Sequence, residues 1–250
     1  MVTSKPASPA AAQFETTHWT VVMSACGTES ADATQALESL CQTYWFPLYA
    51  YIRRRGKGPE DAQDLTQEFL ARLIEKRWLA EVEPRIARFR SFLITALDRF
   101  LINEYDRSQA AKRGGGKPLI SLDQERAEGR YAAEPFTDET PERLFDRRWA
   151  LALLDQALTR LRAENTAGGK ARLFELLNPF LSREAESEEY ARIAPQLGLS
   201  INAIGVAVHR LRQRYREVVR EGVANTLMDS AHLEEEMTYL FSMLRGPEFS

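Results

Sequence analysis

Residues 89–111 read FRSFLITALDRFLINEYDRSQAA, and this stretch decides the fold class. At about 100° per residue, its apolar side chains occupy most sides of a helix, which is typical of a helix buried among others. One stripe is polar. It consists of Arg88, Ser91, Thr95, Arg99, Asn103 and Asp106. We therefore expect a buried helix that exposes a single polar ridge.

The segments on both sides of this helix repeat the helical pattern. Apolar residues at three- and four-residue steps predict helices over 31–44, 48–55 and 60–76, with an interruption at Pro47 and a helix start at Pro59. Further helices are predicted over 141–161, 172–181, 188–197, 201–224 and 231–244. Because no segment shows convincing strand alternation, the predicted fold class is all-α.

Composition divides the chain into two helical domains joined by an acidic linker. Gly114-Gly115-Gly116 ends the first helical block, and residues 123–146 hold eight acidic residues against three arginines. Such a segment predicts a flexible tether. The expected parts are a disordered N-terminus (1–12), a helical domain (13–113), the linker (114–140), a second helical domain (141–224) and an extension with a C-terminal helix (225–250).

Several classes of protein are excluded by what the chain contains. Its 250 residues are 44% hydrophobic, but no apolar run approaches the roughly 20 residues that span a bilayer. Cys26 and Cys41 are too few for a disulfide framework or a structural zinc site. His18, His209 and His232 are isolated, so neither a metal, a cofactor nor catalysis is expected. We expect a cytoplasmic protein that is not an enzyme.

The formal net charge of -3 conceals two basic segments. Residues 85–117 carry eight basic side chains against three acidic ones, and residues 201–216 carry four arginines and no acid. Positive charge confined to particular helices is typical of a nucleic-acid binder. An ordinary solvated basic face is the alternative.

Residues 189–214 fit a helix-turn-helix. Gly198 can supply the positive φ of a short turn, and Ser200 can cap the second helix. Pro195 predicts that the first helix ends early or bends. The leading end of the second helix would meet base edges through Asn202, Ala203, Gly205, Val206, His209 and Arg210, and Arg212, Arg214 and Arg216 would contact phosphates.

Together these motifs resemble bacterial RNA polymerase sigma factors of the extracytoplasmic-function group. The resemblance rests on DAQDLTQEF at 61–69, FRSFLITAL at 89–97 and the helix-turn-helix that follows, and it covers roughly residues 30–220. It implies a promoter-melting domain (sigma domain 2), a linker and a helix-turn-helix domain (sigma domain 4), with core RNA polymerase and promoter DNA as partners. The acidic linker would then follow the polymerase's RNA path.

The resemblance also assigns roles to individual residues. The residues that would contact the clamp helices of the largest polymerase subunit are Asp61, Asp64, Leu65, Gln67, Glu68 and Phe69. In the alternative, Leu65 and Phe69 face the core. The loop 80–88 would open and read the -10 element together with Arg99, Asn103 and Arg107. Further DNA contacts are expected from Arg88, Arg90, Lys112 and Arg113. The helix-turn-helix, including Ser200, would read the -35 element.

Two positions depart from the family pattern. Gln63 stands where the docking helix usually carries an acid, and Gly205 replaces a commonly basic residue of the recognition helix. Some similar sigma factors are activated by a serine/threonine kinase, so phosphorylation of Thr66 is expected to supply the missing charge. An ordinary helical threonine is the alternative. An anti-sigma factor is a further candidate partner.

The C-terminal helix is amphipathic and begins with the acidic run Glu234-Glu235-Glu236. Its apolar side, which includes Met237 and Phe241, would pack on the DNA-reading domain as a flap that competes with DNA for the arginine helix. A dimer contact or an extension of the core are alternatives. For the whole chain, a stand-alone helix-turn-helix regulator or a structural adaptor are the competing functions.

Overall fold

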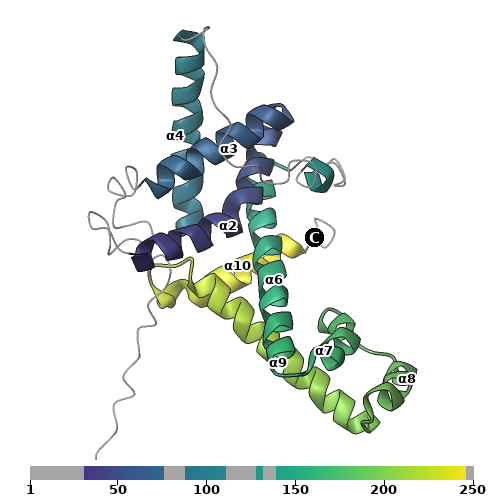
Figure 1. The fold of residues 1–250 in the computed structure, drawn as a ribbon. Helices are drawn as coiled ribbons and strands as arrows, with labels where there is room; N and C mark the ends of the chain where they lie inside the picture. Colours follow the sequence, from purple (N-terminus) through teal and green to yellow (C-terminus); the bar gives the residue numbers. More distant parts are fainter. Residues whose placement is uncertain (1–30, 76–87, 111–127, 132–138, 246–250) are drawn as a thin grey trace, which may run out of the picture.

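The structure is a computed structural model that describes residues 31–75, 88–110, 128–131 and 139–245, and these are mostly helical (Figure 1). The helices are α2 (Ala31–Arg54), α3 (Pro59–Ile74), α4 (Phe89–Ala110), α6 (Pro141–Ala167), α7 (Ala171–Leu177), α8 (Ser187–Leu197), α9 (Ile201–Ala224) and α10 (Leu233–Leu244), with short 3-10 helices η2 (Asn178–Leu181) and η3 (Ser230–His232). Within these ranges there is no strand, and an isolated antiparallel bridge joins Arg88 to Leu227. The predicted all-α class is confirmed.

The larger hydrophobic core combines residues from both ends of the chain. It contains side chains of α2, α3 and α4 together with the first half of α6, the end of α9 and α10. Tyr44 lies at its centre, edge-on to Phe89 with ring centroids 5.1 Å apart and stacked on Phe145 at 6.1 Å. Trp149 is also fully buried in this core. Burial of such large aromatic side chains makes this junction a major source of stability.

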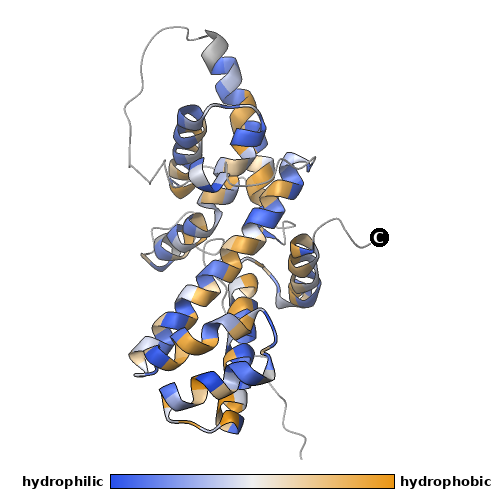
Figure 2. Ribbon diagram, turned by 90° about the vertical axis from the view of Figure 1, so that its right-hand side faces the viewer, coloured by the Kyte–Doolittle hydropathy of each residue, from blue (hydrophilic) through white to orange (hydrophobic). Residues whose placement is uncertain are grey.

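A second, smaller core lies at the other end of α6 and α9, where α7, η2 and α8 pack (Figure 1). Its buried members are Leu161, Phe174, Leu177, Phe180, Ile204, Val208 and Leu211. Figure 2 shows that apolar and polar residues alternate along these helices, so each helix has a core side and a solvent side. Both cores are therefore built on the same two long helices.

This arrangement differs from the expected pair of domains on a flexible tether. The start of the predicted second domain, including Phe145 and Trp149, lies in the core of the first. Part of the predicted linker also packs on α2, because Glu128 forms an ion pair with Arg53 at 2.7 Å and Arg130 lies over the Phe46 ring at 4.4 Å. The N-terminal segment 1–12 and most of the linker lie outside the described residues.

Two prolines behave differently from the prediction. α2 continues through Pro47, and α8 continues through Pro195 to Leu197. A proline in a helix removes one backbone hydrogen bond, but burial of the residues that follow Pro47, such as Leu48 and Tyr49, outweighs that loss. Pro195 lies in the last turn of α8, just before the helix ends.

Candidate functional site

The acidic face of α3 is exposed to solvent. Pro59 begins the helix as predicted, and Asp61, Asp64 and Glu68 are exposed along one side. Gln67 is half-buried beside them. Glu68 also forms an i,i+4 ion pair with Arg72. The carboxylates of Asp61 and Asp64 are therefore available to a basic partner.

The apolar residues of α3 belong to the core. Phe69 is fully buried, and its ring centroid lies 5.7 Å from that of Phe100. Leu65 is half-buried and packs against the same core. Burial of Phe69 fits the alternative in which it faces the core, so its contact with the polymerase stays a prediction without support from this arrangement.

Thr66 is fully buried, and its hydroxyl donates a hydrogen bond to the carbonyl oxygen of Ala62 at 2.6 Å. A kinase cannot reach this hydroxyl while α3 is packed. The arrangement fits an ordinary helical threonine whose hydroxyl bonds back to the preceding turn.

The polar ridge of α4 is present and exposed. Arg99 and Asn103 are solvent-exposed, and Arg107 is exposed with an ion pair to Glu104 at 2.7 Å. The C-terminal part of α4 projects beyond the rest of the molecule (Figure 1). Cationic and amide groups on a projecting helix can contact phosphates and base edges.

Two large side chains on this part of α4 were missed by the sequence analysis. Ile102 is 62% exposed and Tyr105 is 58% exposed. Residues two apart on a helix face different sides, so Tyr105 points away from the ridge of Arg99 and Asn103. Its exposed ring could stack on a base only from that other side of α4.

Arg88 and Arg90 are not on the open ridge. Arg88 forms ion pairs with Glu235 at 2.6 Å and with Glu236 at 2.9 Å. Arg90 is 11% exposed, and its Nε donates to Glu236 at 2.5 Å. Carboxylates occupy both guanidinium groups in this structure, so these two residues can contact DNA only when those carboxylates release them.

The helix-turn-helix is formed as predicted. Gly198 ends α8 with φ of 63°, and the Ser200 hydroxyl accepts a hydrogen bond from the backbone N–H of Ala203 at 3.2 Å. The first two turns of α9 present a largely exposed surface. Asn202, Val206, His209 and Arg210 are exposed, and Ala203 and Gly205 are half-buried.

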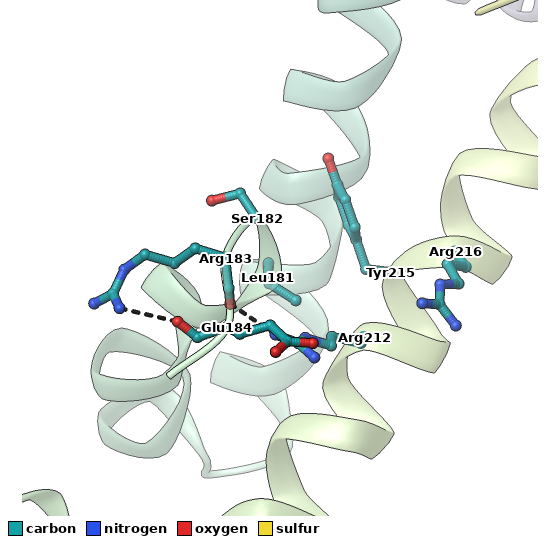
Figure 3. Close-up of a pocket in the computed structure, with 7 residues that line it drawn as sticks. All are labelled: Leu181, Ser182, Arg183, Glu184, Arg212, Tyr215 and Arg216. Carbon is teal, nitrogen blue, oxygen red and sulfur yellow. Dashed lines mark hydrogen bonds between the residues drawn. The ribbon is translucent and has the colours of Figure 1, made fainter. Parts of the chain in front are cut away.

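The arginines further along α9 have structural partners. Arg212 donates to the carbonyl oxygen of Phe180 at 2.8 Å, so it ties η2 to α9. It also donates to the carbonyl oxygen of Arg183 at 2.7 Å (Figure 3). Arg214 is held by Glu164 at 2.8 Å and by two further glutamates of α9, and these carboxylates raise its pKa. Both arginines are engaged within the protein, and their phosphate contacts stay a prediction. Arg216 is exposed and lines a hollow beside Arg212 (Figure 3).

Some predicted contacts lie outside the described residues. These are Lys112, Arg113 and the loop 80–87.

Within the described ranges, no group of three histidine, cysteine or acidic side chains is placed to hold a metal ion. In the same part of the chain, no single helix has the length and apolar composition to cross a bilayer. The helices 188–197 and 201–224, which meet at a bend of 96°, together have the length and composition of a membrane span, on those two criteria alone.

Comparison with known proteins finds a family model that matches part of the chain. No curated protein and no solved structure shows a significant match to the chain. Residues 42–111 match the family model for sigma-70 region 2. The matched segment contains the end of α2, all of α3 and α4, and thus both the acidic face and the polar ridge. This match covers less than half of the chain and supports a likeness to RNA polymerase sigma factors over those residues.

Proposed function

We propose that this chain is a sigma factor of the extracytoplasmic-function group that acts in the cytoplasm on two promoter elements. The acidic face of α3, with Asp61, Asp64, Gln67 and Glu68, docks on the clamp helices of core polymerase. The ridge of α4, with Arg99, Asn103 and Arg107, reads the -10 element. The first turns of α9 read the -35 element as duplex.

The observation that supports this proposal best is the overlap of two findings. The sigma-70 region 2 match spans residues 42–111, and within that span α3 and α4 expose polar side chains while burying most of their apolar ones. The helix-turn-helix at 187–224 lies outside the match, and it supplies the second DNA-reading element that a sigma factor of this group needs.

Reconstituted transcription tests the proposal. Core RNA polymerase is mixed with the full chain and with genomic promoter fragments, and run-off products are mapped. The proposal expects discrete start sites that require the chain. Equal products with the chain omitted would contradict it.

A binding comparison separates the proposal from a stand-alone regulator. A sigma factor of this kind co-purifies with core polymerase and binds duplex promoter fragments weakly alone. A stand-alone helix-turn-helix regulator binds the duplex unaided and without polymerase. A structural adaptor shows no salt-dependent DNA binding at all.

A further inference from the structure

The acidic start of α10 lies against the basic start of α4. The expected partner of this run was the arginine helix of the helix-turn-helix, but the structure places Glu235 and Glu236 on α4 and pairs Glu234 with Arg220 of α9. The neighbouring backbones are also joined, since the N–H of Phe89 donates to the carbonyl oxygen of Thr226 at 3.0 Å.

One carboxylate bridges both arginines. Glu236 is 1% exposed, its Oε1 accepts from Arg90 at 2.5 Å, and its Oε2 lies 2.9 Å from the Nε of Arg88. Glu235 is 66% exposed and lies 2.6 Å from the other end of Arg88. Helix α10 therefore neutralises both guanidinium groups at the start of α4.

The site around Arg90 is closed on its remaining sides. Its guanidinium lies 4.2 Å from the Tyr239 ring centroid and 5.4 Å from that of Trp149, and Asp146 of α6 accepts from it at 2.9 Å. Tyr239 donates to the other oxygen of Asp146 at 2.5 Å. The contact thus joins α4, α6 and α10 in one network.

We propose that α10 is an intramolecular latch that occupies the template-binding arginines Arg88 and Arg90 and must release them before the chain can hold single-stranded promoter DNA. The inference rests on the proposed function, in which the ridge of α4 reads the -10 element, and it adds the two arginines at the start of the same helix to that surface. Glu235 and Glu236 take the place that DNA phosphates would take. Because one guanidinium cannot bind a carboxylate and a phosphate with the same donors, latch closure and DNA binding exclude each other.

The test compares two isosteric substitutions on the same helix. Glu236→Gln removes the bridging charge, and Glu234→Gln removes an equal charge that is paired only with Arg220 among the described contacts. Each full-length variant is titrated onto a labelled single-stranded oligodeoxynucleotide of mixed sequence, and anisotropy is followed over a range of salt concentrations. The matched control removes the general effect of lowering the negative charge.

The latch predicts that Glu236→Gln binds the oligonucleotide about tenfold more tightly than Glu234→Gln. Two released arginines also steepen the dependence of log K on log salt by about 1.4 for a single strand. Adding Arg88→Gln and Arg90→Gln to the Glu236→Gln variant abolishes the gain.

Equal binding by folded Glu236→Gln and Glu234→Gln would overturn the latch and leave α10 as ordinary packing. A gain that survives loss of both arginines would overturn it as well. If circular dichroism shows that Glu236→Gln does not fold, the exposed Glu235→Gln is compared with Glu234→Gln instead, with a smaller gain expected through Arg88 alone.

The outcome is separable from that of the proposed function. If the chain supports initiation with core polymerase but Glu236→Gln binds the oligonucleotide no more tightly, the proposed function stands and the latch is overturned. If Glu236→Gln binds the oligonucleotide more tightly but the chain never supports initiation, the latch over single-stranded DNA stands and the proposed function is overturned.

Discussion

At the scale of single residues, the role of a side chain in α3 depends on the face it occupies. Asp64 is exposed, and Phe69, five residues later, is fully buried against Phe100. A charged group on the open face can act on a partner without affecting the fold. A buried ring contributes to stability and contacts no partner.

Asp64→Ala and Phe69→Ala should therefore fail in different ways. We expect Phe69→Ala to lower the free energy of unfolding by about 3–5 kcal/mol, because it removes buried surface and leaves a cavity. We expect Asp64→Ala to keep its stability and to bind core polymerase more weakly. Urea unfolding and co-purification with polymerase measure the two effects, and a strongly destabilised Asp64→Ala would contradict this division.

The arginines of α9 offer a second contrast at this scale. Arg210 is exposed at the leading part of the helix, whereas Arg214 is engaged by Glu164, Glu217 and Glu221. We expect Arg210→Ala to reduce the slope of log K for duplex binding against log salt concentration by about 0.9 in magnitude, which corresponds to one lost phosphate contact. Arg214→Ala should leave that slope unchanged. Equal slopes for both variants would show that Arg210 contacts no phosphate.

At the scale of elements, two glycines of the helix-turn-helix differ in backbone conformation. Gly198 has φ of 63°, and a Cβ there would meet no atom within 4 Å. Gly205 lies inside α9, where a Cβ would only touch Tyr190 at 4.0 Å. Space is therefore available at both positions, and the backbone conformation decides the effect of a substitution.

The same change at both glycines should shift stability in opposite directions. We expect Gly198→Ala to destabilise the fold by about 1–2 kcal/mol, the cost of the left-handed conformation for an L-residue. We expect Gly205→Ala to stabilise it by up to about 1 kcal/mol through higher helix propensity. Unfolding midpoints of the two variants against the unmodified chain measure both, and equal signs would contradict the backbone argument.

The start of α8 is a second element with a measurable signature. Glu189 accepts from Arg183 at 2.6 and 2.7 Å and from the backbone N–H of Glu186 at 2.9 Å. Arg183 first, and the backbone N–H second, lower the pKa of Glu189 from 4.5 to about 2. A depressed pKa in the folded state means that the stabilisation is present above about pH 4.5 and is lost as the pH falls toward 2.

Glu189→Gln should therefore be less stable than the unmodified chain at neutral pH. The difference should shrink as the pH falls from about 4.5 toward 2, because the Glu189 carboxylate of the unfolded chain takes up a proton in this range while that of the folded chain stays charged. Urea midpoints across this pH range measure it, with the exposed Glu188→Gln as the control. A difference that is constant with pH would show that the contact is not ionic.

At the scale of the whole molecule, two cores share α6 and α9. The larger core holds α2, α3, α4 and α10 against them, and the smaller core holds α7, η2 and α8. Phe174 is fully buried in the smaller core and is absent from the larger one. Such a division allows one end of the molecule to open while the other stays closed.

Phe174→Ala should loosen only the helix-turn-helix end. We expect amide hydrogen exchange to speed up in α7, α8 and the start of α9, while protection in α2, α3 and α4 changes little. Mass spectrometry of the exchanged peptides measures this. A uniform loss of protection along the chain would show that the two cores unfold as one unit.

The sequence by itself determined the elements and their local signals. Periodicity alone predicted the all-α class, because each helix carries its own apolar stripe, and Pro59, Gly198 and Ser200 marked boundaries through effects that span only a few residues. The polar ridge of α4 could be predicted for the same reason, since Arg99 and Asn103 are separated from the apolar side chains by helix geometry.

Only the tertiary structure decided which charged residues remain available. Arg90, Arg212 and Arg214 look alike in the sequence, but distant residues engage all three: Glu236 and Asp146, the carbonyl oxygens of Phe180 and Arg183, and Glu164. Likewise, α10 and the start of α6 join the core of α2, α3 and α4, which composition had placed in a separate domain. The physical reason is that helical periodicity is local, whereas burial and ion pairing depend on segments far apart in the chain.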